Sequence, residues 1–88
     1  MTVNETLTQR ANTHGSFKDN ADIAQRLKAV IRSGKEYAVL SNDKREAIDM
    51  ICHKLARIVS GNPEYADHWH DVAGYATLVD NDLLDRLI

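Results

Sequence analysis

The sequence contains few of the residues that mark secreted, membrane-bound or β-rich proteins. Its single cysteine, Cys52, permits no disulfide within the chain, and one proline and four glycines among 88 residues are few for a fold rich in β-turns. No segment approaches the roughly 20 apolar residues of a membrane helix, and the polar N-terminus lacks the apolar run of a secretion signal. These absences predict a cytoplasmic protein without a membrane partner.

Charge is balanced and dispersed along the chain. It carries 11 Lys and Arg against 13 Asp and Glu, for a net charge of −2, and the basic residues are scattered. Nucleic-acid binding depends on clustered basic residues that neutralise phosphates, so a nucleic-acid partner is not expected. With 43% hydrophobic and 27% charged residues, the composition is that of a globular domain.

Hydrophobic spacing predicts an all-α fold in one domain. Residues 1–19 are polar and carry no sustained apolar period, so we expect a flexible segment and loop, with Phe17 anchoring the chain to the core. Residues 20–88 are expected to form a single helical domain. Its three helices are predicted over residues 20–33, 43–60 and 63–80.

The first predicted helix has recognisable ends. Asp19 or Asn20 can cap its free N–H groups, and Gly34 fits the left-handed residue that often follows a helix. Apolar residues at i, i+4, i+7 and i+8 form one buried face between these ends: Ile23, Leu27, Val30 and Ile31.

The strongest local signal joins the second and third helices. Gly61 ends the second helix, Asn62 caps the third, and Pro63 takes its first helical position. Because this link is so short, the two helices are forced into a central antiparallel hairpin. After a predicted break at Asn81 or Asp82, the chain ends in an apolar tail: Leu83, Leu84, Leu87 and Ile88.

The third helix is apolar on two sides. Trp69 lies at the centre of its main stripe, so we expect this ring in the core rather than on the surface as a stacking platform. Gly74, Tyr75 and Leu78 lie on or near the opposite side. That side is covered either by a partner subunit or by the N-terminal segment or first helix. Since so short a chain has a thin core, we expect a homodimer that completes the helical bundle.

Carboxylates and histidines gather on the two hairpin helices. Glu46, Asp49, His53 and Arg57 share one stripe because they lie three or four residues apart. Carboxylates suit Mg²⁺, which leaves room for substrate phosphates, and histidine favours Mn²⁺. We therefore expect a Mg²⁺ or Mn²⁺ site; the alternative is an ordinary solvated surface. The candidate metal ligands are Glu46, Asp49, Asp67, His68 and Asp71.

Three further residues are candidates for contacting a phosphorylated substrate. Lys54 and Arg57 could neutralise phosphate oxygens near the carboxylates. His14 precedes a predicted helix, whose N-terminus carries free N–H donors for an anion. The alternative for this loop is a turn in which Gly15 takes a special backbone conformation. Cys52 flanks an apolar stripe and is expected to be a small core residue.

A longer pattern extends over residues 10–79. Its marks are Thr13-His14-Gly15, Phe17, Asp49, Lys54, Arg57, Gly61, Asp67, Trp69, Asp71, Gly74 and Tyr75. This pattern resembles a family of small phage and prophage proteins that have no assigned activity. The resemblance implies a phage or prophage origin, and hence the cytoplasm of a bacterial host cell.

Glu46-x-x-Asp49 and His68-x-x-Asp71 stand on the two hairpin helices. They distantly resemble the Glu-x-x-Glu and Glu-x-x-Asp metal motifs of the all-α nucleotide pyrophosphohydrolases, the MazG-like and dimeric dUTPase-like group. The resemblance implies Mg²⁺-dependent hydrolysis of nucleoside triphosphates to monophosphate and pyrophosphate, usually by dimers. It also adds Tyr75 to the substrate-binding candidates. The departures are Asp49 in place of Glu, and His68 in place of Glu, for which Asp67 could substitute.

The sequence supports three functional hypotheses. The first is a metal-dependent nucleoside triphosphate pyrophosphohydrolase-like protein of phage origin, which binds or hydrolyses nucleotides; no catalytic residue is assigned. The second is a non-enzymatic phage accessory protein that binds a host protein. The third, a helix-turn-helix DNA-binding protein, is disfavoured because residues 64–71 of its reading helix carry three acids and neither Lys nor Arg.

Overall fold

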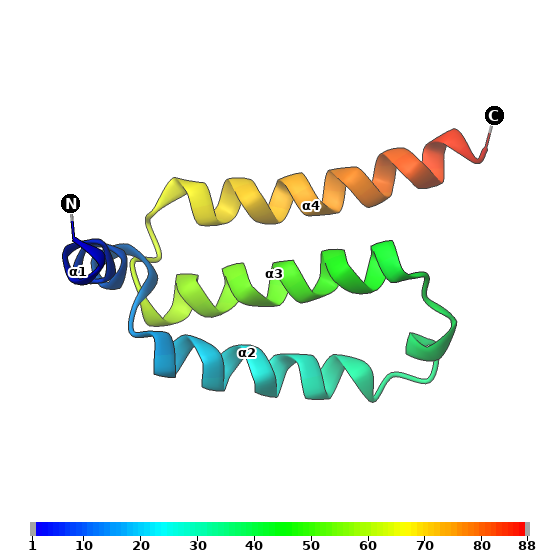
Figure 1. The fold of residues 1–88 in the computed structure, drawn as a ribbon. Helices are drawn as coiled ribbons and strands as arrows, with labels where there is room; N and C mark the ends of the chain where they lie inside the picture. The colour runs from blue at the N-terminus through cyan, green and yellow to red at the C-terminus, as the bar shows by residue number, and fades with distance from the viewer. Residues whose placement is uncertain (1, 88) are drawn as a thin grey trace.

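The fold consists of helices. The computed structural model describes residues 2–87, within which it contains four α-helices, one short 3-10 helix and no strand (Figure 1). The all-α prediction is confirmed. No helix in this part of the chain is both long and apolar enough to span a membrane. The elements are, in chain order, α1 (Val3–His14), α2 (Phe17–Arg32), the 3-10 helix η1 (Tyr37–Val39), α3 (Asn42–Ser60) and α4 (Ala66–Asp85).

Three of the helices lie side by side in a single layer. α3 runs between α2 and α4 and packs against both, whereas α2 and α4 make no substantial contact with each other (Figure 1). α1 crosses one end of this layer, next to the loop between α3 and α4. The radius of gyration is 15.1 Å, compared with about 12 Å for a compact domain of this length. The layer is therefore largely open on its two broad faces.

The core is thin and is made mostly of small side chains. Within residues 2–87, the buried hydrophobic residues are Ala24, Ala47, Cys52, Ala56 and Ile58. Four of these five lie on α3, as expected for the central helix of the layer. Cys52 is the small core residue that the sequence predicts, and burial raises the pKa of its thiol.

Residues 1–19 do not form the predicted loop. Thr2 caps α1, because its hydroxyl accepts a hydrogen bond from the Glu5 N–H at 3.1 Å. No residue of α1 is buried, and Val3, Leu7 and Ala11 give the segment too few apolar positions to predict a helix. Phe17 does not anchor the chain in the core; it is 86% exposed, because it starts α2 at the junction with α1, where no helix covers it.

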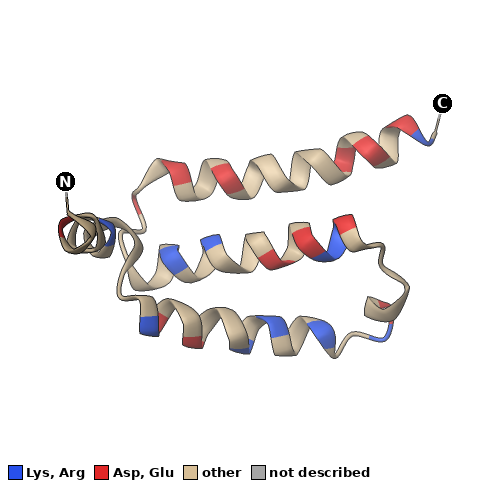
Figure 2. Cartoon of the chain, viewed as in Figure 1, with Lys and Arg blue, Asp and Glu red and all other residues tan. Residues whose placement is uncertain are grey.

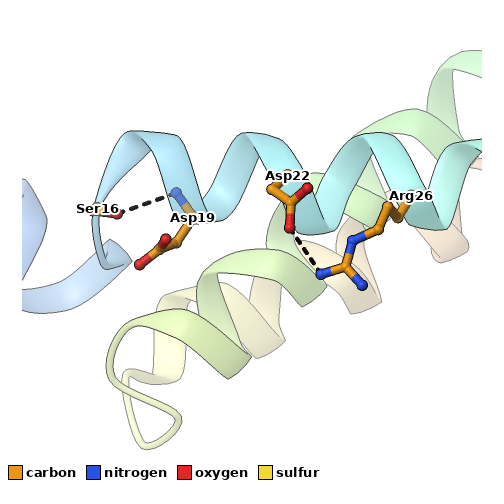
Figure 3. A network of polar contacts seen from close by, with 4 residues as sticks. All are labelled: Ser16, Asp19, Asp22 and Arg26. Carbon is orange, nitrogen blue, oxygen red and sulfur yellow. Dashed lines mark hydrogen bonds and ion pairs between the residues drawn. The ribbon is translucent and has the colours of Figure 1, made fainter.

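α2 begins at Phe17 rather than at residue 20. Its cap is Ser16, whose hydroxyl accepts a hydrogen bond from the Asp19 N–H at 3.1 Å (Figure 3). One turn later, Asp22 and Arg26 form an exposed ion pair at 2.9 Å. Asp19, predicted as a cap, therefore lies within the first turn of the helix.

The prediction that Gly34 takes the left-handed conformation is also wrong. Among the residues described, only Gly15 has a positive φ. α2 is followed by Ser33 in the right-handed conformation, and the chain continues through further turns into η1. Because the chain does not reverse its handedness after α2, Gly34 does not need the left-handed region.

α3 and α4 form the predicted antiparallel hairpin, with Gly61 as the C-cap of α3 (Figure 1). Pro63 does not start α4, because the Asn62 side chain accepts a hydrogen bond from the Glu64 N–H at 2.9 Å and holds a turn there. α4 therefore begins at Ala66.

The far end of α4 is longer than predicted. The helix continues through Asn81 and Asp82 and ends at Asp85. Arg86 pairs with Asp82 at 2.9 Å, which adds support to the last turn. Ile88, part of the predicted apolar tail, lies outside the described residues.

α4 is rotated relative to the prediction. Trp69, expected in the core, is 54% exposed, and its indole N–H donates to the Pro63 carbonyl at 2.8 Å. His68 is buried instead, and the half-buried Asp71 and Tyr75 follow it along the helix. In this orientation, His68 and Asp71 make polar contacts with other segments of the chain.

Candidate functional site

Two glycines allow the end of α1 to pack on the α3–α4 loop. Gly15 has a φ of 80°, in the region that favours glycine, and an added Cβ would overlap the Ser60 backbone. A Cβ at Gly61 would overlap the Thr13 carbonyl, to which the Asn62 N–H donates at 2.9 Å. The special backbone conformation considered for Gly15 is therefore confirmed.

His68 ties α4 to the same junction. It is 2% exposed, and its Nε2 lies 3.0 Å from the Thr13 carbonyl oxygen. A carbonyl only accepts, so this nitrogen carries the hydrogen. The ring stands edge-on to His14 at 4.7 Å and to Tyr65 at 4.8 Å between centroids. His68 thus joins α1 to the hairpin, and its Nε2 is not free to bind a metal ion.

A basic pocket lies beside this junction. Its volume is about 480 Å³, and it is bordered by α1, the start of α2 and Arg57 of α3. Arg10, Arg57 and His14 line it, and none of its described lining residues carries a carboxylate. The start of α2 adds the positive end of the helix dipole. Two of the four predicted substrate-binding residues, His14 and Arg57, therefore share one pocket.

A smaller cavity adjoins the basic pocket between α2 and α3. Its volume is about 180 Å³, its lining includes His53, and it shares Phe17, Asn20 and Arg57 with the basic pocket. The exposed Phe17 ring thus borders both cavities. An aromatic ring beside basic groups is a surface on which a nucleobase can stack.

The two cavities hold histidines that are neutral near pH 7. Burial and the nearby Arg57 guanidinium lower the pKa of His14. Burial and the Lys28 ammonium, 2.9 Å from its Nε2, lower the pKa of His53. The permanent positive charge of the basic pocket therefore comes from Arg10 and Arg57, and a bound anion would raise the pKa of His14.

The five predicted metal ligands do not come together within one chain. Asp49 lies 3.5 Å from Arg32 of α2. Asp71 pairs with the buried Lys54 at 2.9 Å, and this contact lowers the pKa of its carboxyl. Within residues 2–87, no three His, Cys, Asp or Glu side chains form a group that could hold a metal ion. The Mg²⁺ or Mn²⁺ site remains a prediction.

The antiparallel register explains this separation. Because Lys54 faces Asp71, Glu46 falls about two turns away along α3. Glu46 borders a groove together with Leu78 of α4 instead. Asp67 is exposed on the first turn of α4. One chain therefore holds its carboxylates at separate points along the hairpin, as the charge distribution in Figure 2 illustrates.

The other two substrate candidates do not line the basic pocket. Lys54 is buried and engaged by Asp71. Tyr75 lines a groove of about 420 Å³ on α4 with Gly74 and Leu78. The predicted set of four residues is therefore divided between two parts of the molecule.

Sequence reasoning missed Arg10, Phe17 and Asn20 as residues of the pocket. Arg10 lies four residues before His14, so a helix places both on one side. The pattern Thr2-x-x-Glu5 is the signature of a helix start and would have revealed that helix.

Fold and site together define an all-α domain with a basic pocket where α1 meets the α3–α4 hairpin. Over residues 2–82 the sequence matches the family model described as a domain of unknown function, DUF6378, and the chain belongs to that family. No curated protein matches the sequence, and no solved structure matches it.

Proposed function

We propose that this protein binds a nucleotide through its phosphates in the basic pocket. The observation that carries the proposal is the convergence of Arg10 and Arg57 with the start of α2 around one cavity of about 480 Å³. Guanidinium groups and helix N-termini both favour phosphate oxygens. No carboxylate among the described lining residues opposes an anion.

The size and lining of the site favour a nucleotide over a free phosphate ion. The volume falls in the range of small-molecule sites, which is roughly 300–1,000 Å³. Phosphates bound between Arg10 and Arg57 leave the Phe17 ring beside them for the base. The adjoining cavity, which Phe17 also lines, supplies polar groups, including His53.

Hydrolysis of the bound nucleotide is a separate prediction, which rests on the resemblance to MazG-like pyrophosphohydrolases. It requires Mg²⁺ or Mn²⁺ near the phosphates. The contacts of Asp49 and Asp71 with basic side chains do not fit a metal site built by one chain, so we derive no catalytic step. Pyrophosphate release from a panel of ribo- and deoxynucleoside triphosphates, lost in Asp49→Ala and Asp71→Ala, would establish the activity.

Calorimetric titration with the same triphosphates tests the binding proposal. A hydrogen bond to a charged group contributes about 1.5–3 kcal/mol, so Arg57→Gln or Arg10→Gln should weaken binding by roughly 10- to 100-fold. Arg26→Gln is the matched control, because Arg26 is an exposed arginine of α2 that does not line the pocket. An equal loss in Arg26→Gln, or no binding to the native protein, would refute the proposal.

The alternative is a non-enzymatic accessory protein that binds a host protein. The groove on α4 favours it, because Leu78 there is 66% exposed beside Gly74 and Tyr75. Co-purification of one host protein that is lost in Leu78→Asp, together with no response to nucleotides, would support this alternative.

A further inference from the structure

The layer formed by α2, α3 and α4 has two broad faces of different chemistry. On one face, Lys28 of α2 contacts His53 of α3 at 2.9 Å, and Arg32 contacts Asp49 at 3.5 Å. Arg57 lies four residues after His53, on the same stripe of α3, and lines the basic pocket. This polar face therefore carries both the charged contacts between α2 and α3 and the pocket.

The opposite face of the layer is apolar. At 100° per residue, Ile48 and Leu55 point away from the His53 side of α3. A groove of about 280 Å³ joins Ile48 to Ala76 of α4; its lining is apolar except for Lys44 at one end of α3. On α2, Ile23, Leu27 and Val30 lie on this side of the layer, and the ion pair of Asp22 and Arg26 borders them. We call this surface the apolar face; it is represented by Leu27, Val30, Ile48, Leu55, Val59, Trp69 and Ala76.

Much of the apolar face is open in a single chain. Val30 is 72% exposed, Val59 is 69% exposed and Trp69 is 54% exposed. α1 does not cover these side chains, since it borders the Arg57 pocket at one end of the polar face. Exposed apolar side chains that gather on one face of a molecule mark a site of association.

The accessible surface of the chain is larger than that of a compact monomer, because the layer is open on both broad faces. The chain exposes 6421 Å², whereas a compact monomer of 9.9 kDa exposes about 5,200 Å². The excess is about 1,200 Å² per chain. Two chains that buried this excess against each other would share an interface of about 2,400 Å², which is within the range of obligate homodimers.

We propose that a second copy of this chain covers the apolar face, so that two three-helix layers pack face to face. A two-fold arrangement brings the same patch together from both chains. The charged contacts between α2 and α3 lie on the polar face, so packing through the apolar face keeps the charges of the two chains apart. Gly74 and Leu78, on the side of α4 for which the sequence suggested a partner, stay outside the interface, and both basic pockets remain accessible. The proposal does not depend on nucleotide binding.

Sedimentation equilibrium of the full chain tests this dimer. The native protein should have twice the mass of one chain at micromolar concentration. Val30→Arg and Val59→Arg should each halve that mass and keep the native helical circular dichroism, because both side chains are exposed in the single chain. Leu78→Arg is the matched control: it is 66% exposed but on the other flank of α4, and should stay dimeric.

Trp69 provides a second measurement that needs no variant. It is the only tryptophan in the chain, so its emission should shift to longer wavelength when the native protein is diluted below its dissociation constant. A native mass of one chain at hundreds of micromolar would overturn the proposal. Dissociation caused by Leu78→Arg but by neither valine variant would overturn it as well.

Discussion

Replacing Gly15 with alanine should undock α1 from the hairpin. Gly15 has φ 80° and ψ −176°, a combination that is essentially restricted to glycine and costs other residues about 1–3 kcal/mol. The added Cβ would also overlap the Ser60 carbonyl, which is backbone and cannot move aside as a flexible side chain would. Since a domain of this length is stable by only about 4–13 kcal/mol, the loss is a large part of the total.

Gly74→Ala provides the control for this substitution. An added Cβ at Gly74 meets nothing within 4 Å, and the residue lies inside α4. Alanine there should stabilise the helix by about 1 kcal/mol. The same chemical change should therefore have opposite signs at Gly15 and Gly74.

Urea denaturation followed by circular dichroism measures both effects, and amide hydrogen exchange locates them. In Gly15→Ala, the denaturation midpoint should fall and the amides of α1 should exchange faster, because the contact of Thr13 with His68 is lost. A Gly15→Ala protein with the native midpoint and native protection of α1 would refute the role assigned to this junction.

Three other predictions follow from the charged and titrating groups. Asp71→Asn should lower the urea midpoint at pH 7, because it leaves the buried Lys54 unpaired. Lys54 lowers the pKa of Asp71 in the folded protein, so this stabilisation is present above the unfolded pKa of about 3.9 and is lost as the pH falls through the folded-state pKa. The difference between the native and variant midpoints should therefore shrink in acid. Sulfate, whose charge is constant near neutral pH, should bind the basic pocket more tightly as the pH falls toward 6, because a bound anion raises the lowered pKa of His14. Calorimetry should show no such pH dependence in His14→Gln. Cys52, 1% exposed and with a raised pKa, should react with a thiol reagent only at the rate of unfolding, which a measurement of labelling rate against urea concentration checks.

Hydrophobic periodicity predicted the helices whose stability comes from burial. α2 and α3 carry clear apolar stripes, and both were found within a few residues of the expected bounds. α1 buries no residue and is held by its Thr2 cap and by the contacts at its C-terminal end. Neither feature produces an apolar period, so this helix was missed.

The rotation of α4 could not be predicted from its own sequence. Trp69 is its largest apolar residue, and a helix considered alone would bury it. In the observed orientation, His68 instead donates a hydrogen bond to the Thr13 carbonyl and Asp71 pairs with Lys54. Both contacts are with segments distant in the sequence. A helical pattern contains no information about such partners.

The candidate site was predictable in part, for the same reason. His14 and Arg57 were named as phosphate-binding residues, and both line the basic pocket. Arg10 and Phe17 were not, because the first depends on the missed helix and the second was expected in the core. The carboxylates were grouped from their spacing on the two hairpin helices, whereas the Lys54 pair places Asp71 about two turns of α3 away from Glu46.

Chemical-shift mapping by NMR, during titration with a non-hydrolysable nucleoside triphosphate, tests the central claim most directly. The account predicts saturable shifts of the His14 ring, the Arg10 and Arg57 side chains and the Phe17 ring, with the groove at Tyr75 unaffected. Shifts centred on Tyr75, or no saturable shift at millimolar nucleotide, would contradict it.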